Sequence, residues 1–192
     1  SGNDTIDAAL GTDSTIDAGA GDDTVYGTPG DDEITAGDGA DTVNGEAGND
    51  TITGGDGNDN LQGDTGNDTI TGDTGDDTIT GGDGNDTLNG TTGDDSLIGG
   101  QGADNLSGGD GSDNLEGNAG NDSLFGQSGT DSLSGSQGDD IMAGGEGIDQ
   151  LDGGVGLNMC DYDSGEITNE TCRYDDVGPV YSSMVVSPTV VD

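Results

Sequence analysis

The chain has 192 residues, of which 42 are Gly and 42 are Asp or Glu, while Lys and Arg together contribute one residue and the formal net charge is -41. Because hydrophobic residues make up 26% of the chain and aromatic residues 3%, the composition excludes an ordinary globular core and predicts a repeat architecture or disorder. The lack of His excludes His-dependent catalysis and His-ligated metal sites, and the single basic residue excludes nucleic-acid binding through a basic patch.

The N-terminal segment 1–16 enters a repeat with irregular spacing. Positions 1–7 carry the repeat motif around Ile6, but the next apolar residue in register, Ile16, follows after one nonapeptide plus one inserted residue. Ser14 stands where later copies have Asp. We therefore predict an irregular first coil over residues 1–16 that forms the N-terminal edge.

Residues 17–160 repeat with a period of nine. A large apolar residue recurs at every ninth position without a break, which no disordered acidic segment would need. The apolar positions are Ile16, Val25, Ile34, Val43, Ile52, Leu61, Ile70, Ile79, Leu88, Leu97, Leu106, Leu115, Leu124, Leu133, Met142, Leu151 and Cys160.

Asp and Gly recur with the same period. A Gly lies four residues before each apolar position, from Gly21 to Gly156, and a further Gly often lies three residues earlier. An Asp lies two residues before each apolar position until Asn158 ends the series. These Asp residues are Asp23, Asp32, Asp41, Asp50, Asp59, Asp68, Asp77, Asp86, Asp95, Asp104, Asp113, Asp122, Asp131, Asp140 and Asp149.

The resulting unit, G-x-x-G-[N/D/x]-D-x-U-x with U aliphatic, resembles the RTX nonapeptide repeat G-G-x-G-x-D-x-U-x. The best copies are GGDGNDNLQ (54–62), GGDGNDTLN (81–89) and GGDGSDNLE (108–116). The resemblance covers about sixteen units in register and implies a parallel β-roll with calcium bound in the turns. We predict an all-β, right-handed parallel β-roll, or β-solenoid, with a small C-terminal cap.

The spacing agrees with this fold on physical grounds. The tripeptide x-U-x predicts a very short strand whose central side chain faces inward, and the Gly-rich hexapeptide between strands predicts a chain reversal. Two strands and two turns make one coil, which equals two nonapeptides. Apolar residues therefore stack on apolar residues, and Asp stacks on Asp.

The stacked Asp residues predict calcium sites. Carboxylates two nonapeptides apart, such as Asp50 and Asp68, would repel each other at roughly 5 Å unless a cation lay between them. Ca²⁺ prefers oxygen ligands and accepts carboxylates mixed with backbone carbonyls. The fifteen Asp residues form thirteen such pairs, so we expect about a dozen Ca²⁺ ions and folding that depends on them.

Other readings of the repeat are weaker. Paired carboxylates occur in glycosidases, but here every coil repeats the same pair, and we expect no enzyme. Aligned outward Thr residues, such as Thr35, Thr53 and Thr71, resemble an ice-binding face, although other residues soon interrupt the column. The Glu residues outside the motif are expected to be surface charge. The recurrent Asn-Asp-Thr/Ser sequons are expected to be by-products of the repeat. Among the sequons, Asn169 is the best candidate for a glycan.

The C-terminal segment 161–192 leaves the repeat and is expected to cap the roll. Cys160 occupies the last apolar position and Cys172 lies in the cap, so we predict a disulfide between them in an oxidising compartment. The Val-rich tail around positions 185–191 could add a strand to the open edge of another copy.

These features predict a calcium-binding structural module that is secreted or displayed at a cell surface. No apolar run is long enough for a membrane-spanning helix, so direct membrane insertion is not expected, and the expected partners are calcium and further copies arranged end to end in a layer, matrix or filament. Two alternatives stay open: an RTX secretion and folding region of a larger toxin, protease or adhesin, and an ice-binding adhesin domain.

Overall fold

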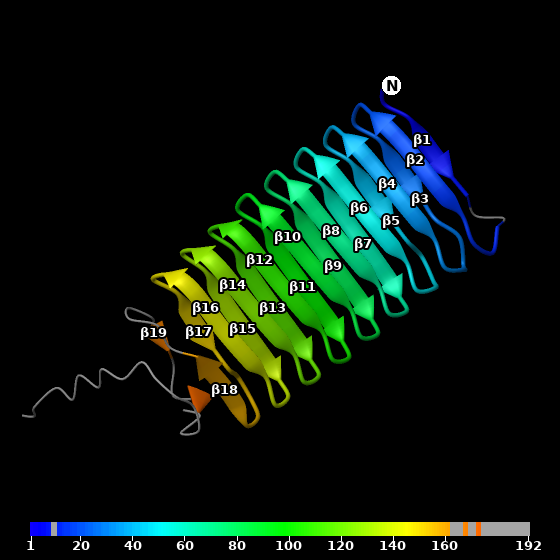
Figure 1. Ribbon diagram of the computed structural model, residues 1–192. Helices are drawn as coiled ribbons and strands as arrows, with labels where there is room; N and C mark the ends of the chain where they lie inside the picture. The colour runs from blue at the N-terminus through cyan, green and yellow to red at the C-terminus, as the bar shows by residue number, and fades with distance from the viewer. Residues whose placement is uncertain (9–10, 162–166, 169–171, 174–192) are drawn as a thin grey trace, which may run out of the picture.

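The computed structural model describes residues 1–8, 11–161, 167–168 and 172–173, and the regular elements in these ranges are all β-strands. Successive strands alternate between two parallel sheets of ten strands each, and the coils stack along one axis from β1 to the C-terminal strands (Figure 1). The predicted all-β parallel solenoid is confirmed.

The odd-numbered strands form the first sheet. In order, they are β1 (Thr5–Asp7), β3 (Thr24–Tyr26), β5 (Thr42–Asn44), β7 (Asn60–Thr65), β9 (Thr78–Asp83), β11 (Ser96–Gln101), β13 (Asn114–Ala119), β15 (Ser132–Gln137), β17 (Gln150–Asp152) and β19 (Ile167–Thr168). The even-numbered strands form the second sheet: β2 (Thr15–Ala20), β4 (Glu33–Asp38), β6 (Thr51–Asp56), β8 (Thr69–Thr74), β10 (Thr87–Thr92), β12 (Asn105–Gly111), β14 (Ser123–Gly129), β16 (Ile141–Gly147), β18 (Asn158–Asp161) and β20 (Cys172–Arg173).

From β2 to β18 the register between coils equals two nonapeptides, as the repeat predicts. Ile34 pairs with Ile52, and Ile52 with Ile70, so that apolar side chains stack on apolar side chains. The first coil is one residue longer than two nonapeptides, because Ile6 pairs with Val25, and the last steps are shorter, because Gln150 pairs with Ile167 and Asn158 with Cys172. The longer first coil confirms the slip at the N-terminal edge.

Most strands are longer than the predicted tripeptide. β6, for example, runs from Thr51 to Asp56, and its pairing with β8 continues beyond the apolar segment to Gly55 with Asp73 and Asp56 with Thr74. The prediction that the whole hexapeptide between apolar segments forms a turn was therefore wrong. The Gly-rich half of the motif still pairs in parallel with the next coil, and the chain reverses in the short segment that remains.

The core is a double column of apolar side chains between the sheets. From Val25 to Leu151 these side chains are at most 1% exposed, and Ile16 and Cys160 at the two ends are 8% and 6% exposed. The first Gly position of the nonapeptide motif also faces inward. It holds Gly in most copies and Ala at Ala18 and Ala36, and residues of this size allow the two sheets to approach closely. Each nonapeptide buries one aliphatic side chain, and each such burial stabilises the fold by about 2 kcal/mol.

The C-terminal coil is closed by the predicted disulfide, since Cys160 in β18 and Cys172 in β20 are bonded across a Cα–Cα distance of 5.6 Å. β19 and β20 each add one strand to a sheet. The remainder of the predicted cap, the Val-rich tail and Asn169 lie outside the described residues. No helix in the described ranges could span a membrane.

Candidate metal centres in the turns

Each turn places its motif Asp directly beside the equivalent Asp of the neighbouring coil. The backbone N–H of Asp32 donates to Asp50 Oδ1 at 2.8 Å, and the N–H of Asp50 donates to Asp68 Oδ1 at 2.8 Å. The same bond joins all thirteen predicted pairs, at 2.7–2.9 Å. Two inner Asp columns result, one along each edge of the solenoid: Asp23 to Asp149 before the odd strands and Asp32 to Asp140 before the even strands.

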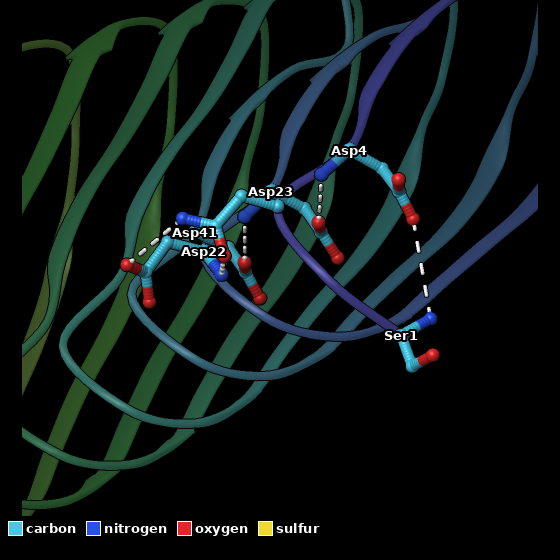
Figure 2. Close-up of polar contacts among 6 residues, drawn as sticks. Ser1, Asp4, Asp22, Asp23 and Asp41 are labelled. Atoms are coloured by element: carbon cyan, nitrogen blue, oxygen red, sulfur yellow. Dashed lines mark hydrogen bonds and ion pairs between the residues drawn. The ribbon is translucent and has the colours of Figure 1, made fainter.

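The N-terminal turn continues the odd column with a step that is one residue longer (Figure 2). The N–H of Asp4 donates to Asp23 Oδ1 at 2.6 Å, and the N–H of Asp23 donates to Asp41 Oδ1 at 2.7 Å. The terminal amine of Ser1 lies 4.0 Å from Asp4 Oδ2, and both groups are exposed. Such an exposed pair adds little to stability.

The second carboxylate oxygen is buried without a partner in fourteen of the fifteen motif Asp residues. The side chains are at most 3% exposed, and Asp32 is the exception because both of its oxygens accept hydrogen bonds. The unpartnered atoms are the Oδ2 atoms of Asp23, Asp41, Asp50, Asp59, Asp68, Asp77, Asp86, Asp95, Asp104, Asp113, Asp122, Asp131, Asp140 and Asp149. A buried oxygen with negative charge and no partner is costly, so each atom requires a proton or a cation.

Burial raises the pKa of twelve of these carboxyl groups, those from Asp41 to Asp140. Desolvation is the largest cause at Asp77 and raises its pKa to about 7, with further contributions from the charges of Asp59 and Asp95, although the N–H of Asp59 lowers it. For the same first cause, burial, the pKa of Asp59 and of Asp86 rises to about 6. A bound cation that neutralised their charge would lower the pKa of these carboxyl groups again.

Backbone carbonyls lie beside the unpartnered oxygens. A β-carbon built on Gly81 would overlap Asp86 Oδ2 and would lie 2.8 Å from the carbonyl oxygen of Gly99. Gly63 has the same surroundings, with Asp68 Oδ2 and the carbonyl of Gly81. The first motif position thus lies where a carboxylate oxygen and a carbonyl oxygen converge, which explains its requirement for a very small residue.

The donor set fits a hard cation. The described residues contain no group of three or more His, Cys, Asp or Glu side chains that could hold a metal, and the oxygens that lie together in each turn are a carboxylate and a backbone carbonyl. The chain has no His, and both Cys are in the disulfide, so imidazole and thiolate ligands are lacking. Mixed carboxylate and carbonyl ligation is characteristic of Ca²⁺.

A second, outer column was not predicted from the sequence. The residue before each motif Asp is often Asn or Asp, and its exposed side chain accepts the N–H of the equivalent residue in the next coil. Asn67 N–H donates to Asn49 Oδ1 at 2.9 Å, and Asn85 N–H donates to Asn67 Oδ1 at 2.7 Å. The direction of donation differs between the two columns. In the outer column the later residue donates its N–H to the earlier one, whereas in the inner column the earlier residue donates to the later one. The sequon residues Asn49, Asn67 and Asn85 therefore have a structural role in the turns.

The last turn of the even edge has Asn158 in place of Asp. Its Oδ1 accepts the N–H of Asp140 at 2.9 Å, as a motif Asp would, but its Nδ2 donates to the carbonyl of Gly153 at 2.6 Å. The side chain is fully buried. This turn therefore contains no unpartnered carboxylate oxygen.

Comparison with known families agrees with this geometry. A family model described as "RTX calcium-binding nonapeptide repeat (4 copies)" matches residues 1–15, 17–52, 53–88, 80–115, 107–142, 116–151 and 134–166. The chain therefore belongs to the RTX calcium-binding nonapeptide repeat family and is a calcium-binding repeat module of the β-solenoid type. A search of curated proteins found no match.

Proposed function

We propose that the chain is an extracellular structural module whose folding is driven by Ca²⁺ bound in its turns. The observation that carries this proposal is the set of fourteen buried Asp Oδ2 atoms without a hydrogen-bond partner. The fourteen motif Asp residues that carry these atoms are the proposed ligands, together with turn carbonyls, in about a dozen sites. Metal binding and folding are then one event, because the apolar core is a single side chain per nonapeptide.

The extracellular location is supported by the Cys160–Cys172 disulfide, which suits an oxidising compartment. By analogy with extracellular calcium modules, we expect affinities on the order of 0.1–1 mM. The proposed activity is structural rather than enzymatic. An RTX region of a larger secreted toxin, protease or adhesin would use the same calcium chemistry.

The experiment is a calcium titration followed by far-UV circular dichroism, with Mg²⁺ as the matched control. We expect an unfolded spectrum in excess chelator and a cooperative gain of strand signal with Ca²⁺. Mg²⁺ should be much less effective, because it demands near-ideal octahedral geometry and gives up water reluctantly. Strand spectra that are the same in calcium and in chelator would refute the proposal.

We further propose, as a second candidate, end-to-end association into a layer or filament. Strands β1 and β2 end the two sheets and, among the described strands, each pairs on one side only. Such edges accept a further strand. Sedimentation velocity in calcium should show an average mass that increases with protein concentration, and a monomer across the range would refute this candidate.

A further inference from the structure

The turn at residues 27–32 satisfies its Asp without a cation. Asp32 Oδ2 accepts the N–H of Thr28 at 2.5 Å, and Asp32 Oδ1 accepts both the Thr28 hydroxyl at 2.9 Å and the N–H of Ser14 at 2.6 Å. Thr28 is completely buried. Its N–H therefore binds Oδ2, the carboxylate oxygen that has no partner in the other turns, while its hydroxyl adds a second bond to Oδ1.

A close sequence match within the chain indicates the cause. Residues 27–32 read GTPGDD and residues 90–95 read GTTGDD, so the two turns differ only in Pro29 against Thr92. In the second turn Thr91 has a positive φ of 93°, and Asp95 Oδ2 is buried without a partner. Thr28 does not have a positive φ. A residue before Pro is restricted to extended conformations, so Pro29 turns the Thr28 N–H toward Asp32.

The turn at residues 153–158 reaches the same result with an amide. A β-carbon on Gly153 would lie 2.7 Å from Asn158 Nδ2, the place that a carboxylate Oδ2 takes in the other turns. There the neutral amide donates to the Gly153 carbonyl at 2.6 Å. A direct hydrogen bond thus joins the side chain to a turn carbonyl with no ion between them.

Both turns belong to the even edge, where they stand at opposite ends of one inner column. Asp50 to Asp140 lie between them, each with an unpartnered Oδ2. On the odd edge, the first and last motif Asp residues of the regular array, Asp23 and Asp149, both have an unpartnered Oδ2. The two edges therefore differ in how their columns end.

We propose that the Asp32 and Asn158 turns hold no calcium. At these two ends of the even column, hydrogen bonds made by Thr28 and by Asn158 take the place of an ion. This inference rests on the proposed calcium binding. It makes Pro29 a specificity-determining residue, because one substitution should convert the hydrogen-bonded turn at Asp32 into a calcium site. The even column then ends in turns that need no ion of their own.

The test is crystallography of the calcium-loaded chain, with anomalous scattering to locate each Ca²⁺. In the unchanged chain we expect ions beside Asp50 to Asp140 and none at Asp32 or Asn158. Pro29→Thr should add one ion at Asp32, and Asn158→Asp should add one ion at residue 158. Equilibrium dialysis should show each gain as one more calcium per chain.

Two controls match these variants. Asn121→Asp adds the same charge in an exposed outer column and should add no ion. Thr91→Gly changes the residue of the 90–95 turn that corresponds to Thr28 and should leave the count unchanged. An ion at Asp32 or Asn158 in the unchanged chain, or no gain in Pro29→Thr while the other sites are loaded, would overturn the inference. Absence of calcium from every turn would instead refute the proposed function.

Discussion

At the scale of single residues, the fourth motif position has the strictest requirement. Gly84 has a φ of 147°, and a β-carbon there would overlap the carbonyl oxygen of Gly66 in the preceding coil. The second position is more tolerant, because Asp64, Asp73 and Asn118 occupy it with φ between 72° and 76°. The two glycine positions of the motif therefore serve different purposes.

We expect Gly84→Ala to reduce the free energy of unfolding by about 3 kcal/mol, from backbone strain and steric overlap. Gly82→Asn, at the more tolerant position of the same motif, should cost about 1 kcal/mol, because Asn adopts the left-handed region readily. Urea unfolding in saturating calcium measures both. Equal losses in the two variants would contradict this distinction.

Thr91 is the least favourable of the non-glycine residues in the left-handed region. It is β-branched, has a φ of 93°, and its buried hydroxyl has no hydrogen-bond partner. We expect Thr91→Gly to stabilise the calcium-loaded chain by about 1 kcal/mol, since strain and an unsatisfied polar group are both removed. Thr87→Gly in the same strand, β10, should instead destabilise it, because Gly weakens a strand interior. A loss of stability in Thr91→Gly would contradict the assignment of strain.

At the scale of strands and turns, the sequence was most informative where one residue type repeats one role. The apolar register and the stacking of Asp50 on Asp68 follow from the periodicity, and the Cys160–Cys172 disulfide follows from the presence of two Cys in a chain expected outside the cell. Strand length was mispredicted because Gly-rich segments suggest turns, whereas the pairing of Gly55 with Asp73 depends on neighbouring coils. The hydrogen-bonded turn at Asp32 depends on the direction of the Thr28 N–H, which composition does not reveal.

The inner Asp columns predict an unusual pH dependence for the calcium-free chain. Burial raises the folded-state pKa of Asp77 to about 7 and of Asp50 to about 6, above the ordinary value of 3.8. When a folded-state pKa is raised, the folded form binds more protons than the unfolded form between the two values. Stability is therefore greatest below pH 3.8 and is lost as the pH rises toward 7.

In excess chelator we thus expect strand circular dichroism to be stronger at pH 4 than at pH 7.5, with protons taking the place of calcium on the buried oxygens. With calcium present, binding should weaken as the pH falls below about 6 to 7, where these carboxyls take up protons. A chelated chain that gains strand content as the pH rises would have the opposite sign and would contradict the shifts.

At the scale of the whole molecule, each coil contacts its neighbours, and the solenoid has no core shared by all of its coils. Ten strands per sheet stacked at about 4.8 Å give a length of roughly 43 Å. Removal of calcium leaves a chain with a formal net charge of -41, whose self-repulsion favours expansion. Two effects of calcium can then be separated: general charge neutralisation and occupation of specific buried sites.

Salt distinguishes the two effects. At 1 M NaCl the Debye length is about 3 Å, so repulsion between exposed carboxylates is largely screened, but a screening ion does not ligate the buried Asp Oδ2 atoms. In chelator we expect a radius of gyration of about 47 Å, the value for an unfolded chain of 192 residues. Added NaCl should reduce that radius without restoring the strand spectrum. Millimolar Ca²⁺ should reduce it to about 16 Å and restore the spectrum together. If 1 M NaCl alone restored both the radius and the spectrum, charge screening would be sufficient for folding, and the unpartnered Oδ2 atoms would not be the reason that the chain needs calcium.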